Sequence, residues 1–198
     1  MKRTGNRLSS RLMKHPQTII VSPYDSPCGR LLLGSLGDAL CLCDWRPSAH
    51  SNHAERVDTR LCRAFGAVYI EGSSPVIDRA KTCLDEYFAG RRRKFDLPLA
   101  LAGTPFQRRV WEALAALPYG ATVTYGDLAR SLGCEGAVRA VAGAVAANAL
   151  SVFLPCHRVT AAAGSMGGYA GGVGTKSFLL ELEKRVVVGF SADSALGL

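Results

Sequence analysis

The stretch FLPCHRVTAAAGSMGGYAGG, residues 153–172, places one cysteine directly before a histidine and follows the pair with a glycine-rich loop. A free thiol has a pKa of about 8.5, so only a minority of it is the nucleophilic thiolate at neutral pH. A histidine within hydrogen-bonding reach can take the proton, and a carboxylate or water behind it can hold the imidazole in place. This pattern makes Cys156 a candidate nucleophile and His157 its candidate base.

A purely structural cysteine is the alternative interpretation of the same residues. Neighbouring side chains on a strand point to opposite faces, so the thiol and the imidazole approach each other only if the chain turns near Pro155. A buried cysteine that only packs is the usual case in an intracellular protein. Chemistry alone therefore leaves both interpretations of Cys156 open.

The glycine-rich loop resembles a phosphate-binding loop only superficially. A P-loop ends in Gly-Lys followed by Ser or Thr, whereas here Thr175 separates Gly174 from Lys176. We therefore exclude nucleotide hydrolysis. We expect the backbone of this loop to lie close to a flat ligand, with Tyr169 as its one large side chain.

The composition predicts a soluble globular protein. The chain has 198 residues, of which 48% are hydrophobic and 20% charged. No apolar run approaches the roughly 20 residues that span a bilayer, and the basic N-terminus lacks the apolar segment of a secretory signal. Seven cysteines without a CxxC pair indicate a reducing cytoplasm. The spacing Cys41-Leu42-Cys43 is poor for zinc, so we predict no metal site.

The net charge of +8 suggests a polyanionic partner, but the excess is concentrated in two segments. Residues 1–14 carry five Lys or Arg and no acid, and residues 91–94 carry four more, which leaves 15 basic residues against 16 acidic ones. Such segments are compatible with phosphate contacts and equally with a solvated tail and linker.

In the first half of the chain, short apolar runs alternate with segments of helical periodicity. We predict strands within 18–22 and 29–45, helices over 55–66 and 76–89, and a last strand over 95–101. We place a domain boundary near residue 100.

The second half has the pattern of helices joined by tight turns. Thr104 caps a helix that ends at Leu117, and Thr124 starts a second helix that ends at Gly133. A third helix follows over 137–148. The last two helices and their glycine-bearing turn have the proportions of a helix-turn-helix.

The helix over 137–148 is unusual because Arg139 is its only charged residue among Ala, Val and Gly. One interpretation is a buried helix whose arginine reaches out to water. The other is a slim helix that lies in a groove and inserts one long cation. Helices that recognise base edges in the major groove usually carry several polar side chains, so we do not expect sequence-specific readout.

Together, the motifs GTPFQRRVW, LPYGATVTYGDLA, RAVAGAVAAN, LPCHRV, GGYAGG and KSFLLELE, in this order, resemble the O6-methylguanine–DNA methyltransferase family. The resemblance implies an α+β fold, with an N-terminal α/β domain that holds a small antiparallel sheet and a mainly helical C-terminal domain with a helix-turn-helix. We accordingly divide the chain into a basic tail (1–17), an N-terminal domain (18–100), a C-terminal DNA-binding and alkyltransferase domain (101–188) and a C-terminal tail (189–198).

The resemblance also implies a mechanism. Cys156 would take the alkyl group from O6 of guanine in one irreversible turnover, without a cofactor. His157 would act as base through an ordered water, with Glu183 as the carboxylate behind it. Asn148 would be the hinge between the recognition helix and the active-site loop, and Tyr125 would donate a hydrogen bond to the guanine ring as negative charge develops on it.

Further residues match the parts of the family that contact DNA and the base. The helix-turn-helix would lie in the minor groove of DNA. Arg139 would enter the base stack when the damaged nucleotide is flipped out, next to DNA contacts from Ala137 and Thr124. The base itself would be contacted by Val159, Tyr169 and Ala170. The chain departs from the family in two places: Ala170 stands where some relatives have serine, and Ala149 follows Asn148 where many have proline.

The implied partner is double-stranded DNA that contains O6-alkylguanine, with O4-alkylthymine as a second candidate substrate, and we expect a cytoplasmic monomer that binds no membrane. Three other functions compete with this one: a lesion sensor that flips the base without transfer, a transcription regulator and an unrelated thiol hydrolase. Relatives that act as sensors have replaced the cysteine, whereas this chain keeps Cys156, His157 and Glu183.

Overall fold

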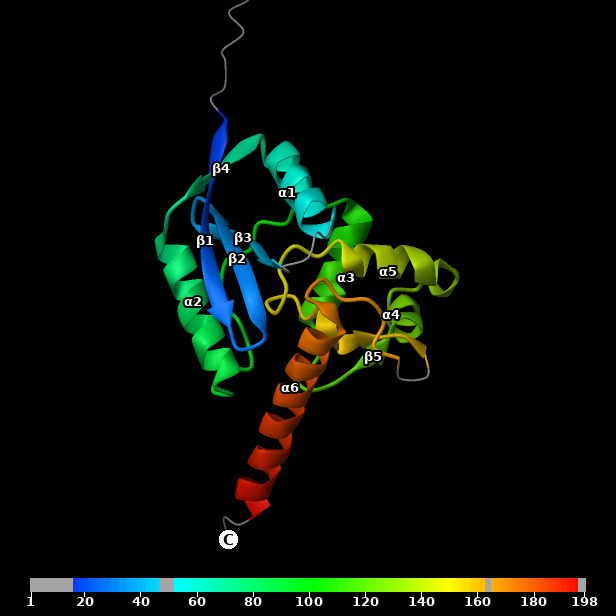
Figure 1. Cartoon of the computed structure of the whole chain (residues 1–198). Coiled ribbons are helices and arrows are strands. Elements are labelled where there is room, and N and C mark those ends of the chain that lie inside the picture. The colour runs from blue at the N-terminus through cyan, green and yellow to red at the C-terminus, as the bar shows by residue number, and fades with distance from the viewer. Residues whose placement is uncertain (1–15, 47–51, 163–164, 196–198) are drawn as a thin grey trace, which may run out of the picture.

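A computed structural model describes residues 16–46, 52–162 and 165–195 (Figure 1). A four-stranded sheet in the order β3-β2-β1-β4 forms the first half of the chain. Its strands are β1 (Gln17–Ser26), β2 (Gly29–Leu36), β3 (Ala39–Trp45) and β4 (Ala67–Glu71). The N-terminal tail that we predict lies, up to residue 15, outside the described residues, and β1 already begins at Gln17.

The α+β fold class is confirmed, but the sheet is mixed and not wholly antiparallel. Strands β1, β2 and β3 pair antiparallel, whereas β4 pairs parallel to β1, from Gln17 opposite Ala67 to Val21 opposite Glu71. Helix α1 (Asn52–Phe65) lies in the connection that leads to β4. The sequence pattern of β4 does not reveal its direction, because this depends on how the chain returns over the sheet.

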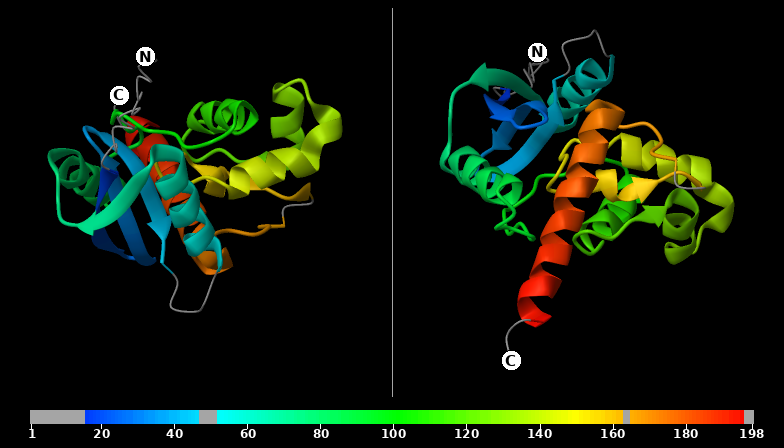
Figure 2. Two further views of the ribbon diagram at one scale, coloured as in Figure 1. Left: turned by 90° about the horizontal axis from the view of Figure 1, so that it is seen from above. Right: turned by 60° about the horizontal axis from the view of Figure 1, so that its bottom comes forward.

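Two helices cover opposite faces of this sheet. Val57 and Leu61 of α1 pack on Ile19 and Val21 of β1, and α2 (Pro75–Phe88) packs on the face formed by other residues of β2 and β3. Figure 2 shows α1 and α2 on the two sides of the strands. The predicted helices over 55–66 and 76–89 are confirmed to within three residues at each end.

The strand predicted over 95–101 is wrong. This segment is irregular apart from a single bridge between Leu99 and Leu40, in which the Leu40 amide donates to Pro98 and the Ala100 amide donates to Leu40. Pro98 in the middle of the segment has no N–H to continue a ladder. The segment instead covers part of the outer edge of β3.

In the second half, the described residues form four α-helices: α3 (Pro105–Ala115), α4 (Tyr125–Ser131), α5 (Val138–Ala146) and α6 (Gly172–Ala195). Capping boxes start two of them, Thr104 with Gln107 at α3 and Thr124 with Asp127 at α4, as the sequence indicates. Between α4 and α5 the chain turns at Gly133, whose φ of +66° is the left-handed conformation that favours glycine. Helix α5 packs on α3 and α4. The predicted pair of short helices is therefore present.

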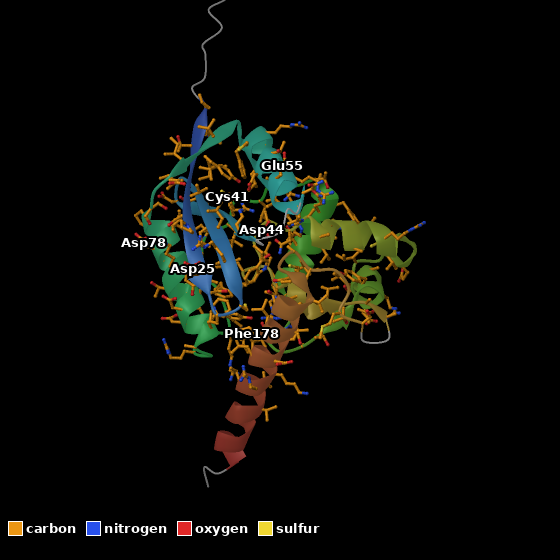
Figure 3. The ribbon with its side chains drawn as sticks, in the orientation of Figure 1. Asp25, Cys41, Asp44, Glu55, Asp78 and Phe178 are labelled. Atoms are coloured by element: carbon orange, nitrogen blue, oxygen red, sulfur yellow. The ribbon has the colours of Figure 1, made fainter. Side chains whose placement is uncertain are left out.

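A short segment after α5 joins the two halves. The Cys43 amide donates to Ala149, and the Ser151 amide donates to the Cys43 carbonyl, so this segment adds to the free edge of β3. In Figure 3, Cys41 and Asp44 lie along β3, close to this junction. A small parallel pair, β5 (Val123–Thr124) with β6 (Val159–Thr160), lies beneath α4.

Helix α6 begins near the junction of the two halves and projects past them (Figure 1). It continues to Ala195, beyond residue 188 where we place the end of the C-terminal domain. Within the part of the chain that the structure covers, we find no helix with the length and apolar composition needed to cross a membrane.

Candidate active site

A cavity of about 500 Å³ opens beside the end of α5. Its size suits a planar ligand as large as a nucleobase. The walls come from both halves of the chain and include five of the predicted site residues. The lining residues are His53, Tyr125, Ala142, Val145, Ala146, Asn148, Ser151, Cys156, Gly168, Tyr169 and Ala170.

Cys156 begins a short 3₁₀ turn, Cys156–Arg158, directly after Pro155. The turn that the sequence leaves open at this proline is therefore present. Asn148, two residues after α5, holds the thiol from the other side. Its Nδ2 donates to Cys156 Sγ at 3.2 Å and to the Leu154 carbonyl at 2.9 Å, and its Oδ1 accepts from the Leu150 amide at 2.9 Å. One side chain thus fixes the end of α5 to the loop that carries the cysteine.

The Cys156 thiol is protonated at rest. Burial raises its pKa to about 11, although the hydrogen bond from Asn148 and the positive charge of Lys176 act in the opposite direction. Cys156 is only 8% exposed, and it lines the cavity. A thiol in this environment needs a base to become a nucleophile.

His157 supplies a basic nitrogen in the right protonation state. Its Nε2 lies 2.8 Å from Glu183 Oε1, and both side chains are fully buried. Burial alone would raise the pKa of Glu183, but hydrogen bonds from His157 and Arg158 lower it to about 2. An ionised carboxylate only accepts, so Nε2 carries the hydrogen.

The other ring nitrogen of His157 is therefore free to accept a proton. Burial lowers the pKa of His157, with the hydrogen bond to Glu183 opposing that shift, so the ring is neutral at pH 7. Within the described residues, Nδ1 is buried and makes no hydrogen bond. No direct hydrogen bond joins Cys156 to His157 there either, which differs from the simplest interpretation of two adjacent residues.

Glu183 is the centre of a larger network that the sequence does not reveal. Arg158 donates to both of its oxygens at 2.9 Å, and the Tyr87 hydroxyl and the Gly120 amide donate at 2.8 Å each. A side chain at Gly120 would require a φ near +78° and would meet Val187 Cγ2 at 2.8 Å. Arg158 is part of the quoted LPCHRV motif, but Tyr87 is 96 residues away from Glu183 in sequence. No sequence pattern links them.

Lys176 is a second residue that sequence reasoning missed. It is completely buried, and its ammonium group donates to the Val159 carbonyl at 2.6 Å and to the Met166 carbonyl. It therefore fastens the glycine-rich loop to β6. Val159, which we expect near the base, is itself buried in the core, and its side chain does not line the cavity.

Tyr169 on the glycine-rich loop lines the cavity and is anchored in the first half of the chain. Its hydroxyl accepts a hydrogen bond from Trp45 Nε1 at 3.0 Å. A Cβ on Gly171 would stand only 2.9 Å from the Trp45 ring, so the closest backbone approach of this loop is to a tryptophan. Gly168, in contrast, faces the open cavity.

Helix α5 buries one face and exposes the other. Val141, Ala144 and Val145 are buried, whereas Arg139 and the small residues Ala140, Gly143 and Ala146 are exposed. A fully buried helix is thereby excluded. The exposed face is narrow enough to enter a groove, with Arg139 as its one long side chain.

Two predicted DNA contacts lie near α5 without entering the cavity. Ala137 is half-buried just before the helix, and Thr124 uses its hydroxyl in the cap of α4, where it donates to Asp127 Oδ2 at 2.7 Å. Across the described ranges, no group of three His, Cys, Asp or Glu side chains is placed to hold a metal ion.

Two family models match the chain in succession. They are described as 6-O-methylguanine DNA methyltransferase, ribonuclease-like domain, over residues 19–101, and 6-O-methylguanine DNA methyltransferase, DNA binding domain, over residues 105–185.

Relatives with the same organisation are found among known proteins. A methylated-DNA–protein-cysteine methyltransferase of Mycobacterium leprae is 50% identical over 105 residues, which are 53% of this chain and 64% of that protein, so the match spans less than two thirds of the relative. The protein of the same name from Haemophilus influenzae is 35% identical over 162 residues, 81% of this chain and 84% of the relative.

A solved structure also matches most of the chain. The crystal structure of Mycobacterium tuberculosis OGT in complex with DNA has a TM-score of 0.69 and 36% identity, with 85% of this chain and 94% of that chain covered. With both family models in order and relatives covered over most of their length, the chain belongs to the 6-O-methylguanine DNA methyltransferase family.

Proposed function

We propose that this chain repairs O6-alkylguanine in double-stranded DNA by moving the alkyl group onto Cys156, once per molecule. The observation that carries the proposal is the pairing of a protonated thiol in a base-sized cavity with a neutral, carboxylate-held His157 on the next residue. The names of the relatives agree with this chemistry. O4-alkylthymine is a second candidate substrate.

The transfer is a displacement at the alkyl carbon. His157 Nδ1 accepts the thiol proton through a bridging water, the sulfur forms a bond to the carbon, and the carbon–O6 bond breaks with its electron pair left on the guanine. Tyr125, which lines the cavity, donates a hydrogen bond to the leaving base while the charge develops. The base then takes up a proton, and the thioether remains on the protein because water does not hydrolyse it.

In this proposal, the damaged base leaves the DNA double helix and enters the cavity. Extrusion costs a few kcal/mol, and we propose that Arg139 on the exposed face of α5 offsets part of that cost by filling the gap. Ala137, which directly precedes α5, and Thr124, which caps α4, would add further DNA contacts. Arg139→Ala should slow transfer from duplex DNA far more than transfer from the free base. Equal slowing on both substrates would contradict this role of Arg139.

Asn148, Tyr169 and Ala170 shape the site around the base in this proposal. Asn148 sets the position of the sulfur, while Tyr169 and Ala170 form the wall of the cavity on the side of the glycine-rich loop. Val159 would contribute only its backbone. We also propose that the protein is a monomer and that it is cytoplasmic. Its seven free cysteines support the second point, because thiols stay reduced in the cytoplasm.

Intact-protein mass spectrometry tests the function directly. After mixing with a duplex that holds one O6-methylguanine, the protein should gain one methyl group, mapped to the peptide that contains Cys156. Cys156→Ala should bind the same duplex and gain nothing. A wild-type protein that binds but never gains mass would be a lesion sensor, and a methylated Cys156→Ala variant would show that the nucleophile is another residue.

A further inference from the structure

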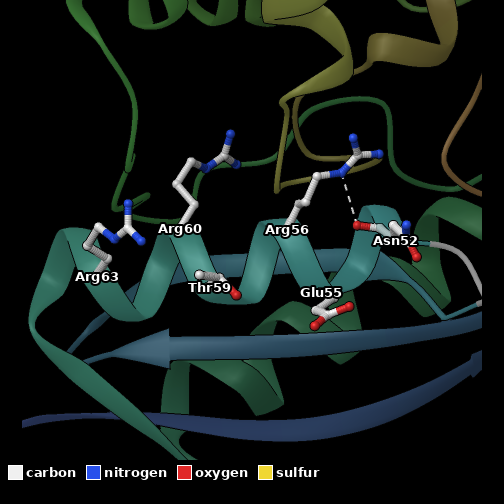
Figure 4. Close-up of a pocket in the computed structure, with 6 residues that line it drawn as sticks. All are labelled: Asn52, Glu55, Arg56, Thr59, Arg60 and Arg63. Carbon is white, nitrogen blue, oxygen red and sulfur yellow. Dashed lines mark hydrogen bonds between the residues drawn. The ribbon is translucent and has the colours of Figure 1, made fainter.

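Three arginines form a row along one face of α1. Arg56, Arg60 and Arg63 follow one another at intervals of four and three residues, which places them on the same side of a helix. Figure 4 shows their side chains directed to the same side, toward the second half of the chain, while Glu55 points away from them. These three residues are called the α1 arginine row below.

The row borders cavities that lead away from the active site. A cavity of about 320 Å³ lies between α1 and α5, with Arg56 and Arg60 on one wall and Gly143, Ala146 and Ala147 on the other. It shares His53 and Ala146 with the active-site cavity. A second cavity, of about 480 Å³, shares Arg56 and Arg60 with it and extends to Arg63, with Glu55 as one carboxylate in its lining. A hollow therefore runs from the mouth of the Cys156 cavity along α1.

The three arginines do not have the same task. Arg60 is half-buried, donates to the Ala147 carbonyl at 2.6 Å and stacks on Trp111, with its guanidinium 5.7 Å from the ring centroid. It holds the two walls of the hollow together. Arg56 and Arg63 are exposed, and the terminal nitrogens of Arg56 point away from α1, while its Nε donates to the Asn52 carbonyl.

The chemistry of the hollow favours a phosphate backbone as its occupant. Its walls combine exposed guanidinium groups, which match phosphate oxygens in a bidentate fork, with small residues of α5 that leave room for a polymer chain. From residue 53 to 63, α1 extends about 15 Å, and phosphates on one DNA strand recur every ~3.4 Å along the axis. An acidic protein would find few apolar side chains to pack on here.

We propose that the α1 arginine row binds backbone phosphates of the strand that delivers its base to the Cys156 cavity, as a second DNA contact besides α5. This inference rests on the proposed function. It gives the first half of the chain a part in holding DNA.

Salt-dependent DNA binding tests the proposal. The logarithm of the DNA-binding constant falls as the logarithm of the salt concentration rises. In the double variant Arg56→Gln/Arg63→Gln this negative slope should become shallower by about 2, since each lost phosphate contact removes about 0.9 from its magnitude. At physiological salt its affinity for a duplex with one O6-methylguanine should fall roughly 30-fold. Transfer from free O6-methylguanine base should change less than twofold, because the base alone does not reach the row.

Two further variants separate charge from packing. Arg79→Gln/Arg91→Gln carries the same loss of charge, but Arg79 lies on α2, which covers the other face of the sheet, and Arg91 lies just after that helix. This variant should bind DNA as the wild type does. The variant Arg56→Lys/Arg63→Lys keeps both positive charges, so its slope of log K against log salt should be close to that of the wild type. An unchanged slope in the glutamine variant, or an equal loss in the lysine variant, would overturn the proposal. A wild-type protein that neither binds the duplex nor reacts with it would instead contradict the proposed function.

Discussion

Cys43 on strand β3 and Cys156 in the loop at 155–159 are both buried, yet of these two cysteines only Cys156 lines the active-site cavity. Burial raises the pKa of Cys43 on β3 well above its ordinary value, and burial raises that of Cys156 to about 11. Both sulfurs are therefore protonated at neutral pH. The difference between the two regions does not lie in the acidity of the resting thiol.

The neighbours make the difference. The charge of Asp44 disfavours a thiolate at Cys43 and at Cys156 alike. Around Cys156 the Asn148 amide and the Lys176 ammonium both favour the thiolate, and the next residue carries a neutral imidazole. A cysteine becomes reactive here because groups that stabilise its thiolate and a base that accepts its proton are present when the substrate arrives.

The largest effect is expected when the two cysteines themselves are replaced. Cys156→Ala should abolish alkyl transfer, whereas Cys43→Ala should keep the transfer rate within about twofold and lower the free energy of unfolding by about 1–3 kcal/mol, because it leaves a small cavity in the core. Single-turnover transfer and urea unfolding of both variants measure this. A slow Cys43→Ala variant of normal stability would mean that β3 takes part in the chemistry.

Glu183→Gln should give the next largest effect. An amide at this position no longer forces the hydrogen onto Nε2 of His157, and a comparable change behind another catalytic histidine slows the reaction up to about 10⁴-fold. Arg158 also loses its counter-ion in a buried site, which costs about 3–5 kcal/mol of stability. Glu183→Asp keeps the charge and serves as control. Transfer at an unchanged rate in a folded Glu183→Gln variant would exclude the tautomer argument.

The pH dependence of the transfer rate and that of stability distinguish the role of His157 as a base from the effect of its buried neutral ring on folding. Its pKa is lowered in the folded protein, so the neutral ring persists as the pH falls below about 6.5, the usual value in an unfolded chain. The transfer rate should therefore stay level through that region. Stability should be complete above about pH 6.5 and decline below it, as the unfolded chain takes up protons first. The lowered pKa of Glu183 extends this decline from about pH 4.5 toward about 2.

In a His157→Ala variant, the transfer rate should rise with pH in the alkaline range, unlike the rate of the wild type. Without the base, only solvent can ionise the thiol, so the rate should rise about tenfold per pH unit until the pH approaches the Cys156 pKa of about 11. Transfer rates of both proteins between pH 6 and 10 decide the point. A wild-type rate with the same steep rise would mean that His157 does not take the proton.

The sequence predicts those parts of the molecule that depend on local signals. The capping boxes at Thr104 and Thr124 lie within four residues each, and both helices begin where these boxes indicate. The prediction of a strand over 95–101 is wrong because the apolar residues dominate the sequence pattern of this segment. In the fold, Pro98 has no N–H to donate to a ladder, so the segment forms only one bridge to β3. The division of the chain near residue 100 stays a prediction.

Within the site, motif residues and their partners differ in the same way. Cys156, His157 and Glu183 stand in recognisable motifs, so their chemistry can be inferred before their contacts are known. Lys176, although it begins the KSFLLELE motif, and Tyr87 act through contacts that only the folded chain creates. The buried Val152, with a φ of +73°, is another example, because a β-branched residue in the left-handed region is held there by its surroundings and not by its own preference.

The smallest expected effect tests how far the two halves depend on each other. Tyr87 belongs to α2, yet its hydroxyl donates to Glu183 on α6 at 2.8 Å. Tyr87→Phe should lower the free energy of unfolding by about 1.5–3 kcal/mol, the usual value for a hydrogen bond to a charged group. Transfer should slow by less than about tenfold, because Arg158, His157 and the Gly120 amide still hold the carboxylate.

A matched variant on the same helix is Phe88→Leu. Phe88 is half-buried, and its ring lies 5.3 Å from that of Tyr87 between centroids, so the change removes aromatic contacts of α2 but no hydrogen bond to Glu183. If Tyr87→Phe slowed transfer while Phe88→Leu of equal stability did not, the hydroxyl would set the position of the carboxylate and not only support the fold. If both slowed it equally, the first half of the chain would act on the active site through packing alone. The contrast between β3 and the 155–159 loop would then rest on the second half of the chain, since Asn148 and Lys176, which favour the Cys156 thiolate, come from there, as does the proposed base His157.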